Sequence, residues 1–596
     1  MADSIGRIAQ VVPDLPTFAV DDGFSYEIPP DLDALSVGSL VRVPLGARRI
    51  RGYVVSIRAG ETAGLKPVIS VSGNGPIFDE RLLETLRWAA LHYVAPLAAL
   101  LARAAPPNLP RGKGRPGEGD IPDLASPLPD LSAASAAGRH SRPTCLFSSA
   151  NAAVHIGGLS RAPLGAGRNV VAILPTVEEA VACADELRTH FGSRVRYVSS
   201  QVAAKDATRV WVDAQLHGGI LVVGTPEVAL WPLGTPALWI VVEEGRRAMK
   251  AKQTPTLQVR DVIRRRALVE RTGAVFVGAV PTLDTLARGA ATFEPPGRVW
   301  PLVEVIDRRE DQSGNRVLAD RTLTALRLCV RNGGQVFVFV SRRGYAPAFR
   351  CVRCRELRRC PQCGAGPDRG DECRRCGTAL GPCVRCDGRR FEPLGAGLGR
   401  VSDELTKHLG DGVVGSPGSG RQVVVGSERD LPAIPETALT VAVDADSMLM
   451  APHYRAEEDA FRILARTAAT VARGRGSRCL IQTAQPDHRA LGALRRGHPL
   501  EYLRELIDER HRDGLPPASE LIAVEVQGHA GSRADDMLGI ADQGVQVHGP
   551  EFGGGRTRWF LQAPSLQSTR IRLRAVVQQW RDAGLKVRID ADPIDL

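Results

Sequence analysis

The sequence predicts an α/β multidomain protein, on the evidence of its length and of two series of short apolar runs. A chain of 596 residues exceeds what one hydrophobic core supports, so about three to five domains are expected. Apolar runs alternate with helical segments over residues 144–300 and again over residues 301–497. Runs of this kind, buried on both faces, are typical of parallel sheets. The two series therefore predict two α/β lobes in tandem.

Residues 1–105 predict a small β-rich domain followed by a helix. Apolar stretches over residues 6–56 alternate with proline and glycine turn signals, which indicates a small sheet. From Phe78 to Pro107 apolar residues recur at helical spacing, and Asp79 stands at the expected N-cap. This run is therefore expected to form an amphipathic helix whose apolar face packs on the sheet.

Three other segments complete the predicted organisation. Residues 106–143 are rich in Pro, Gly, Ser and Asp without periodicity, and predict a flexible linker. Residues 498–596 combine a helical run with strand-like runs, and predict an α+β C-terminal domain. A cysteine-rich segment at residues 348–390 interrupts the second α/β lobe and is expected to be an insertion.

Net charge and hydropathy limit which partners and which cellular location are expected for this protein. The net charge of +11 favours a polyanionic partner such as nucleic acid, although GC-rich coding, which inflates arginine, accounts for it equally well. The start of the chain lacks a signal-peptide pattern, and no uncharged run reaches the ~18 residues that a membrane helix needs. We therefore expect a cytoplasmic protein with no membrane partner.

The most specific chemistry in the sequence is a cluster of eight of its twelve cysteines. They form four C-x2-C pairs, and paired thiolates at this spacing favour tetrahedral zinc over iron–sulfur clusters or disulfides in a chain of this kind. Eight thiolates predict two zinc ions per chain. Adjacent pairs could share a metal, or the outer pairs could enclose the inner ones, and spacing alone leaves both open. The pairs are Cys351/Cys354, Cys360/Cys363, Cys373/Cys376 and Cys383/Cys386.

Several strings together resemble the PriA family of replication-restart DNA helicases. FSYEIP, VGSLVRVPLG and RGYVVSI, between residues 24 and 57, resemble its 3′-end DNA-binding domain. SRRGYAPAFRCVRC, from Ser341, resembles its entry into the zinc knuckles, and IDADPI, from Ile589, its closing motif. The resemblance implies two RecA-like superfamily 2 helicase lobes with a zinc-binding insertion. The family's winged-helix domain is expected to be missing, because the linker has too few patterned residues.

The resemblance also implies how the cysteines pair and where a DNA end binds. In the family the outer knuckles share one zinc and the inner knuckles the other. This gives Cys351, Cys354, Cys383 and Cys386 for the first zinc and Cys360, Cys363, Cys373 and Cys376 for the second. The family's pocket for a DNA 3′ end falls on Phe24, Ser25, Gly46 and Lys66. Ser25 replaces an aspartate of the family, which weakens a hydrogen bond to the terminal nucleotide.

The nucleotide motifs that the resemblance calls for are degenerate. A P-loop needs a lysine on the phosphates, and no lysine occurs from residue 114 to 204. The family's Asp-Glu-Glu-His string stands here as Glu243-Glu244-Gly245-Arg246, and the coupling string at residues 278–281 lacks its serine and threonine. Of two arginines expected on the γ-phosphate, only Arg473 remains. These losses predict no catalytic residues for unwinding and put ATP binding in doubt.

The leading functional hypothesis is a non-catalytic replication-restart protein. It would bind stalled or branched forks, including their 3′ ends, and promote reloading of the replicative helicase. The implied partners are DNA, the replicative helicase and other primosome components, and the single-stranded DNA-binding protein. The runner-up is an active ATP-dependent 3′–5′ helicase with divergent nucleotide contacts. A third hypothesis is a zinc-ribbon adaptor of RNA polymerase or a topoisomerase, against which the N-terminal strings argue.

Overall fold

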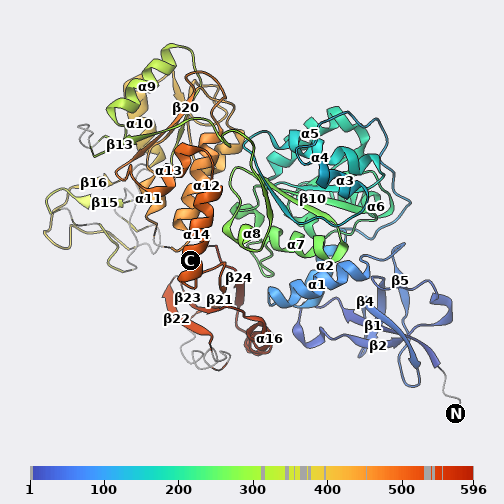
Figure 1. Ribbon diagram of the computed structural model, residues 1–596. Helices are drawn as coiled ribbons and strands as arrows, with labels where there is room; N and C mark the ends of the chain where they lie inside the picture. Colours follow the sequence, from blue (N-terminus) through green and yellow to red (C-terminus); the bar gives the residue numbers. More distant parts are fainter. Residues whose placement is uncertain are drawn as a thin grey trace. The chain divides into compact units, whose positions relative to one another are not determined.

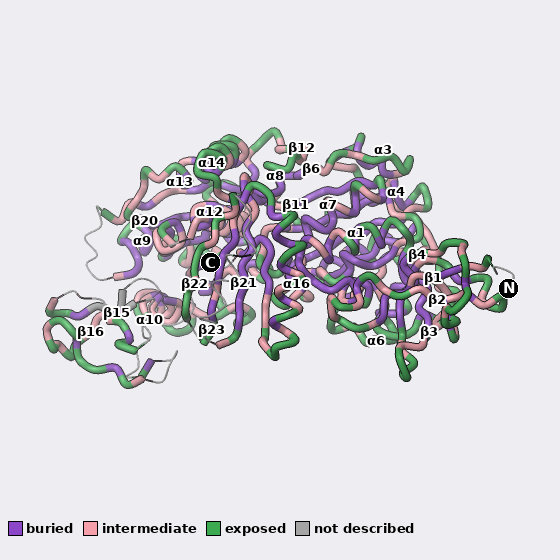
Figure 2. Tube along the Cα trace, turned by 90° about the horizontal axis from the view of Figure 1, so that it is seen from below, coloured by how far each residue is buried: buried purple, intermediate pink, exposed green. Residues whose placement is uncertain are grey.

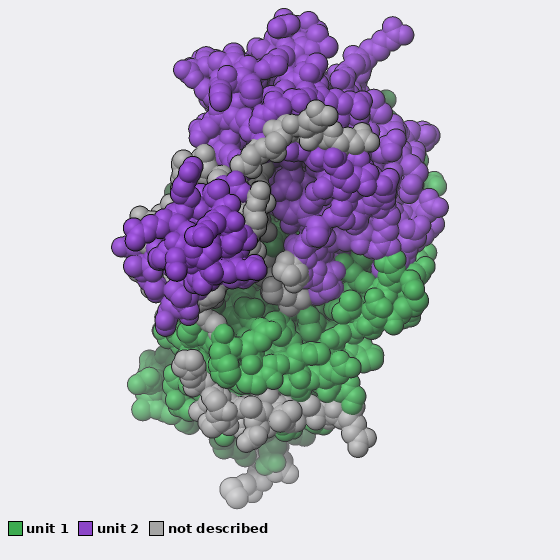
Figure 3. Space-filling view, turned by 90° about the vertical axis from the view of Figure 1, so that its left-hand side faces the viewer, with its two compact units in different colours: residues 1–146, 151–293, 507–596 green, residues 147–150, 294–506 purple. Residues whose placement is uncertain are grey.

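A computed structural model (Figure 1) describes residues 5–309, 316–341, 348–354, 356, 358–362, 372–373, 378–394, 397–451, 453–528, 539, 544–553 and 555–594. The chain divides into two compact units, which are coloured separately in Figure 3. Unit 1 comprises Met1–Leu146, Asn151–Phe293 and Ile507–Leu596, and unit 2 comprises Phe147–Ala150 and Glu294–Leu506. None of the helices in the described parts of the chain is long and apolar enough to cross a membrane.

The N-terminal sheet of unit 1 has five strands in the order β2-β1-β4-β3-β5, and its printed pairings are antiparallel. The strands are β1 (Ile5–Pro13), β2 (Phe24–Glu27), β3 (Leu40–Leu45), β4 (Arg48–Glu61) and β5 (Ser70–Ser72). Alternate residues of β1, β3 and β4 bury a small core that includes Val11, Val41 and Val54. The small sheet predicted over residues 6–56 is confirmed.

Two helices, and not one, follow this sheet. Helix α1 (Glu80–His92) begins as predicted, because the Asp79 carboxylate accepts a hydrogen bond from the Leu82 N–H at 2.8 Å. The apolar run then breaks, because Val94 adopts a positive φ of 47° and Pro96 cannot continue a helix. Helix α2 (Leu97–Ala104) starts afresh after the proline.

The larger sheet of unit 1 has seven strands in the order β12-β6-β11-β10-β7-β9-β8. Its central strand β10 pairs in parallel with β11 and β7, and side chains on both faces of these strands are buried. Figure 2 shows buried chain concentrated along β11 and α7. The strands are β6 (Thr144–Phe147), β7 (Asn169–Ile173), β8 (Val195–Val198), β9 (Leu221–Gly224), β10 (Pro236–Val242), β11 (Gly273–Gly278) and β12 (Ala291–Phe293). Its helices are α4 (Ala152–Gly165), α5 (Val177–Phe191), α6 (Ala204–Leu216), α7 (Val259–Glu270) and α8 (Leu283–Ala287).

Residues 106–143 differ from the flexible linker that their composition predicts. They carry helix α3 (Pro129–Ala136), which packs against α4. Leu128 and Leu131 are buried in the core of the seven-stranded sheet, and Ile121 and Leu124 pack against that core. These few apolar side chains attach the segment, although its Pro and Gly content hides them from any periodicity analysis. The segment contains no winged helix.

The C-terminal part of unit 1 is an α+β domain, as predicted. Four strands in the order β22-β23-β21-β24 pair antiparallel, and helix α16 (Gln567–Asp582) covers their apolar face with Leu573, Val577 and Trp580. The strands are β21 (Glu520–Gln527), β22 (Gln546–Gly553), β23 (Arg556–Ala563) and β24 (Val587–Ala591). Helix α14 (Leu500–Arg512) connects unit 2 to this domain along the chain.

Unit 2 holds the second parallel sheet, in the order β13-β20-β19-β14-β18-β17. With the seven-stranded sheet it gives the two parallel sheets that the two series of apolar runs predict. A separate hairpin, β15 with β16, belongs to the cysteine-rich insertion. The strands are β13 (Val303–Asp307), β14 (Val336–Phe339), β15 (Ala348–Cys351), β16 (Phe391–Leu394), β17 (Val414–Gly415), β18 (Val423–Gly426), β19 (Leu439–Ala442) and β20 (Arg478–Thr483). The helices are α9 (Asp320–Arg331), α10 (Leu398–Leu409), α11 (Asp446–Leu449), α12 (Ala456–Ala469) and α13 (Arg489–Arg496).

Candidate metal centre and nucleic-acid interface

The outer cysteine pairs of the insertion meet in space. Strands β15 and β16 pair antiparallel, with Cys351 opposite Phe391, and this pairing returns the chain to the first knuckle. The ligand atoms of the four outer cysteines all lie within 4.8 Å of one another. The closest Sγ atoms are 3.5 Å apart, both from Cys351 to Cys386 and from Cys354 to Cys383. The structure thus groups the outer pairs as the resemblance implies.

This cluster fits a tetrahedral zinc ion. Four thiolates at Zn–S bonds of 2.3 Å place their sulfurs ~3.8 Å apart, close to the spacing here. Backbone N–H groups, above all that of Cys354, lower the pKa of the Cys351 thiol to about 7, which favours the thiolate that binds metal. Gly388 leaves room for this sulfur, because a Cβ there would lie 3.0 Å from the Cys351 Sγ.

The inner pairs are described only in part. Cys360 and Cys373 are each 2% exposed and share a small buried cluster with Leu380. The Cys373 N–H donates to the Thr378 carbonyl at 2.9 Å. Cys363 and Cys376 lie outside the described residues. The cysteines outside the cluster are packed thiols, fully buried at Cys145, Cys183 and Cys479 and half-buried at Cys329.

The predicted DNA-end pocket gathers around β2. Phe24 is 40% exposed at the start of this strand, which is high for a large aromatic side chain. The Ser25 hydroxyl donates to the Gln10 Oε1 at 2.9 Å, and the Gln10 amide donates to the Asp22 carbonyl at 2.6 Å. Gln10 therefore fixes both the hydroxyl and the turn before Phe24.

Hydrogen bonds from β2 reach Lys66 and Pro44, which is close to Gly46 in the chain. The Tyr26 hydroxyl donates to the Pro44 carbonyl at 3.0 Å, two residues before Gly46. Gly46 has a φ of 59° and open space where a Cβ would stand, so its backbone is accessible. The Glu27 N–H donates to the Lys66 carbonyl at 3.0 Å. Phe24 and Ser25 thus lie on β2, Lys66 is hydrogen-bonded to it, and Gly46 follows Pro44, which is hydrogen-bonded to it, by two residues.

The segment that corresponds to a P-loop is capped by its own side chains. Helix α4 follows β6, and the Asn151 Oδ1 accepts a hydrogen bond from the Ala153 N–H at 3.0 Å. The Asn151 amide in turn donates to a carboxylate oxygen of Glu186 at 2.7 Å. An acidic side chain beside this helix start opposes phosphate binding there.

The two glutamates that follow β10 accept hydrogen bonds from the segment that follows β11. Glu243 has a φ of 49°, and its Oε1 accepts a hydrogen bond from the Ala279 N–H at 3.1 Å. Glu244 is 3% exposed, and its Oε1 accepts from the Thr282 N–H at 2.7 Å and from the hydroxyls of Thr282 and Thr285 at 2.9 and 3.0 Å. Neither threonine was predicted as a site residue from the sequence. The N-cap pattern that starts α8 at Thr282 is the signal that could have found them.

Arg246 and Arg473 also donate hydrogen bonds to other groups of the protein. Arg246 donates to both carboxylate oxygens of Glu179 at 2.6 Å, within unit 1. In unit 2, Arg473 donates to the Val299 carbonyl at 2.7 Å and to the Arg298 carbonyl at 3.1 Å. Each guanidinium is thus hydrogen-bonded to the protein itself.

Comparisons with known proteins find a family model that matches the N-terminal domain. Residues 10–106 match the family model of the PriA 3′ DNA-binding domain (3′BD). The chain is 23% identical to the replication restart protein PriA of Treponema pallidum, covering 94% of this chain and 95% of that protein. It is 25% identical to the protein of the same name in a Synechocystis species, over 73% of this chain and 60% of that protein. For the probable replication restart protein PriA of Deinococcus radiodurans the identity is 27%, over 72% of this chain and 52% of that protein.

Two solved structures show distant likeness. The structure of RecG bound to a three-way DNA junction has a TM-score of 0.35 at 11% identity. The match covers 85% of this chain and 72% of the RecG chain. Dbp5 of S. cerevisiae, bound to RNA and ADP BeF3, has a TM-score of 0.36 at 9% identity, covering 65% of this chain and 93% of its own. Over most of its length the chain is thus similar to replication restart proteins named PriA, and residues 10–106 match the PriA 3′ DNA-binding domain.

Proposed function

We propose that this chain binds DNA at stalled or branched replication forks, with its N-terminal domain on a 3′ end, and promotes reloading of the replicative helicase without unwinding DNA itself. The observation that carries the proposal is the 3′ DNA-binding domain match over residues 10–106, with an exposed Phe24 on its second strand. The replicative helicase, other primosome components and the single-stranded DNA-binding protein are the protein partners proposed.

The chemistry around β2 suits a terminal nucleotide. An exposed phenylalanine offers a face on which a base or sugar can stack. The Ser25 hydroxyl donates to Gln10, so its oxygen keeps acceptor capacity for a terminal sugar hydroxyl. The open backbone at Gly46 permits close approach of the strand, and the Lys66 ammonium supplies charge for a phosphate.

The absence of ATP-driven unwinding is proposed from the contacts of the degenerate motifs. ATP hydrolysis needs a lysine on the phosphates, a carboxylate free to bind Mg²⁺ and an arginine free for the γ-phosphate. Here the Asn151 side chain caps α4 next to Glu186, and the Glu244 carboxylate is buried on Thr282. The Arg473 guanidinium is hydrogen-bonded to main-chain carbonyls.

Zinc is proposed as the structural cofactor. Cys351, Cys354, Cys383 and Cys386 would hold one ion, which cross-links the two ends of the insertion next to the β15–β16 hairpin. Cys360, Cys363, Cys373 and Cys376 are proposed to hold a second, supported by the shared burial of Cys360 and Cys373. Zinc bound by four thiolates has no open position, so its contribution is stability alone.

A binding titration tests the proposed function. The affinity of the protein would be measured for two labelled model forks, one with a free 3′ hydroxyl and one with a 3′ phosphate. Each measurement would be made with and without ATP and Mg²⁺. We expect tighter binding to the free 3′ end and no effect of ATP. Equal affinity for the two forks would contradict the 3′-end assignment.

An ATPase assay separates this proposal from the active helicase. The purified protein is expected to show no DNA-stimulated ATP hydrolysis. Hydrolysis that DNA stimulates and that Glu244→Gln abolishes would establish the active helicase instead. Equal binding to forks and plain duplex would favour the zinc-ribbon adaptor.

A further inference from the structure

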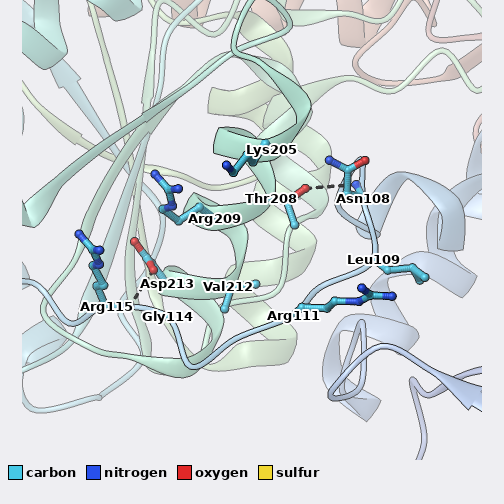
Figure 4. A pocket seen from close by; sticks show the side chains of 10 residues that line it. All are labelled: Asn108, Leu109, Arg111, Gly114, Arg115, Lys205, Thr208, Arg209, Val212 and Asp213. Atoms are coloured by element: carbon cyan, nitrogen blue, oxygen red, sulfur yellow. Dashed lines mark hydrogen bonds between the residues drawn. The ribbon is translucent and has the colours of Figure 1, made fainter.

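A basic pocket of about 380 Å³ lies in unit 1, outside both the cysteine cluster and the surroundings of β2. Its walls are helix α6 and the extended segment 108–115, which leads away from α2 (Figure 4). The lining residues are Asn108, Leu109, Arg111, Gly114, Arg115, Lys205, Thr208, Arg209, Val212 and Asp213.

Hydrogen bonds at both ends fix the segment 108–115 on α6. The Asn108 N–H donates to the Thr208 hydroxyl at 3.1 Å, and the Arg115 N–H donates to the Asp213 carboxylate at 2.7 Å. Gly114 has a φ of 65°, and a Cβ there would lie 3.0 Å from the His217 ring. The pocket is therefore a built feature of the domain, shaped by a backbone that only glycine accommodates.

The pocket lining carries more basic than acidic side chains. Asp213 is neutralised, because Arg196 donates to its second carboxylate oxygen at 2.8 Å. Arg209 lies 3.4 Å from Asp206, but both side chains are more than half exposed, so this pair contributes little. Among the described residues, Arg111, Arg115 and Lys205 have no acidic partner within salt-bridge distance. Several like charges facing one pocket repel each other unless an anion joins them.

The arrangement of these cations and the apolar wall favour a nucleotide over a simple ion. In Figure 4 Lys205, Arg209 and Arg115 lie on one side of the pocket and Arg111 on the other. Leu109, 39% exposed, and Val212 add apolar surface to the pocket lining. The volume lies in the range of small-ligand sites. A phosphate fits the guanidinium and ammonium groups, while a sugar or base fits the leucine.

We propose that this pocket binds one nucleotide unit of single-stranded DNA, with the phosphates on either side of that unit held by Arg111 at one side of the pocket and by Arg115, Lys205 and Arg209 at the other. The proposal rests on the proposed DNA-binding function and adds to it a second contact that is independent of the 3′ end. A single strand is favoured over a duplex because its flexible backbone can place a phosphate and a sugar together inside a concave site.

The test compares Arg111→Gln/Lys205→Gln with the wild type. The matched control, Arg139→Gln/Lys252→Gln, removes the same two charges from exposed positions of unit 1 that do not line the pocket. Binding of labelled oligothymidine with a 3′ hydroxyl or a 3′ phosphate is measured by anisotropy over a range of NaCl concentrations. Equal thermal midpoints for all three proteins establish that the variants are folded.

We expect the pocket variant to bind both oligonucleotides about tenfold more weakly, and its slope of log K against log [NaCl] to fall by about 1.4, or ~0.7 for each lost phosphate contact. Affinity or slope equal to the control would overturn the proposal, as would a loss confined to the 3′-hydroxyl strand. Displacement of the strand by thymidine monophosphate, beyond the effect of NaCl at equal ionic strength, would assign the pocket to free nucleotides instead.

The same data separate failure of this proposal from failure of the proposed function. If the wild type prefers the 3′ hydroxyl but the pocket variant behaves like the control, the pocket proposal is wrong and the proposed 3′-end function stands. If the wild type ignores the 3′ end while the pocket variant still loses affinity, the 3′-end function fails and the pocket stands.

Discussion

Lys250 and Asp590 form a buried ion pair in which the Lys250 Nζ lies 2.6 Å from a carboxylate oxygen of Asp590. Lys250 follows β10 of the seven-stranded sheet, and Asp590 lies in β24 of the C-terminal sheet. The ammonium also donates to the carbonyls of Ala591 and Asp592, at 2.7 and 2.6 Å. Burial lowers the pKa of Lys250, and the neighbouring Asp590 opposes that shift. This contact joins two domains of unit 1.

Replacing Lys250 with methionine is expected to loosen the C-terminal domain. The change leaves the two carbonyls without this donor and leaves the Asp590 carboxylate with its hydrogen bond from Arg588, so the cost is up to about 3–5 kcal/mol for a broken buried pair. Hydrogen exchange of the β24 amides measures the effect, and their protection should fall. Lys252→Met, at an exposed position, is the control. Unchanged protection of β24 would show that the ion pair does not stabilise the domain.

Glu525 gives the C-terminal sheet a pH-dependent stability. It stands directly opposite Arg558 on β23 and Arg588 on β24, and Arg558 donates to its carboxylate at 2.5 Å. Burial raises the pKa of Glu525, but the two arginines outweigh it and hold the pKa below its ordinary value. The stabilisation is therefore complete above about pH 4.3, the unfolded value, and is lost as the pH falls through the folded pKa.

Glu525→Gln should destabilise the sheet by about 1–3 kcal/mol at neutral pH, because it removes a charged hydrogen-bond acceptor. The difference from wild type should shrink below about pH 4, where the wild-type carboxylate becomes protonated. Urea unfolding at several pH values measures this difference. Glu505→Gln, exposed on α14, should show no such trend. A difference that persists at low pH would mean that the charge of Glu525 is not the cause.

Zinc content tests the proposed pairing of the cysteines. Cys360→Ala/Cys373→Ala should lose one zinc per chain and keep the other, because the four outer sulfurs form their own cluster. Cys351→Ala/Cys383→Ala should lose the outer zinc. Metal analysis of the purified proteins gives the stoichiometry, with Cys329→Ala as a control outside the cluster. Two zinc ions retained in Cys360→Ala/Cys373→Ala would contradict the inner site.

Phe24→Ala tests the DNA-end pocket. Loss of a stacked base or sugar costs about 1–3 kcal/mol, so affinity for a free 3′ end should fall about 5- to 150-fold. Affinity for a 3′-phosphate strand should change little. Phe293→Ala is a matched control, since Phe293 is 41% exposed against 40% for Phe24. Equal losses on both strands would show that Phe24 does not read the end.

Local patterns explain what could be predicted about the fold. The buried apolar runs such as NVVAI in β7 identify parallel strands, because only a sheet covered on both faces requires them. The Asp79 carboxylate caps α1 because capping depends on the neighbouring three residues alone. The eight-cysteine cluster was visible for the same reason, since a metal knuckle is a short-range motif.

Long-range contacts explain what could not be predicted. Leu128 and Leu131 attach a proline-rich segment to the core of the seven-stranded sheet, and nothing in their neighbourhood indicates the surface that they meet. The break between α1 and α2 at Val94 belongs with these features, because Val94 lies in the core of the C-terminal domain.

The sequence by itself determined that this protein has two parallel α/β sheets and a cysteine cluster with knuckle spacing. These properties depend on residue type and on spacings of a few positions. Only the tertiary structure decided that the outer cysteines meet, that Glu244 is held by Thr282, and that Arg111 and Lys205 line one pocket. Each of these depends on which distant segments pack together, and packing is a property of the whole folded chain.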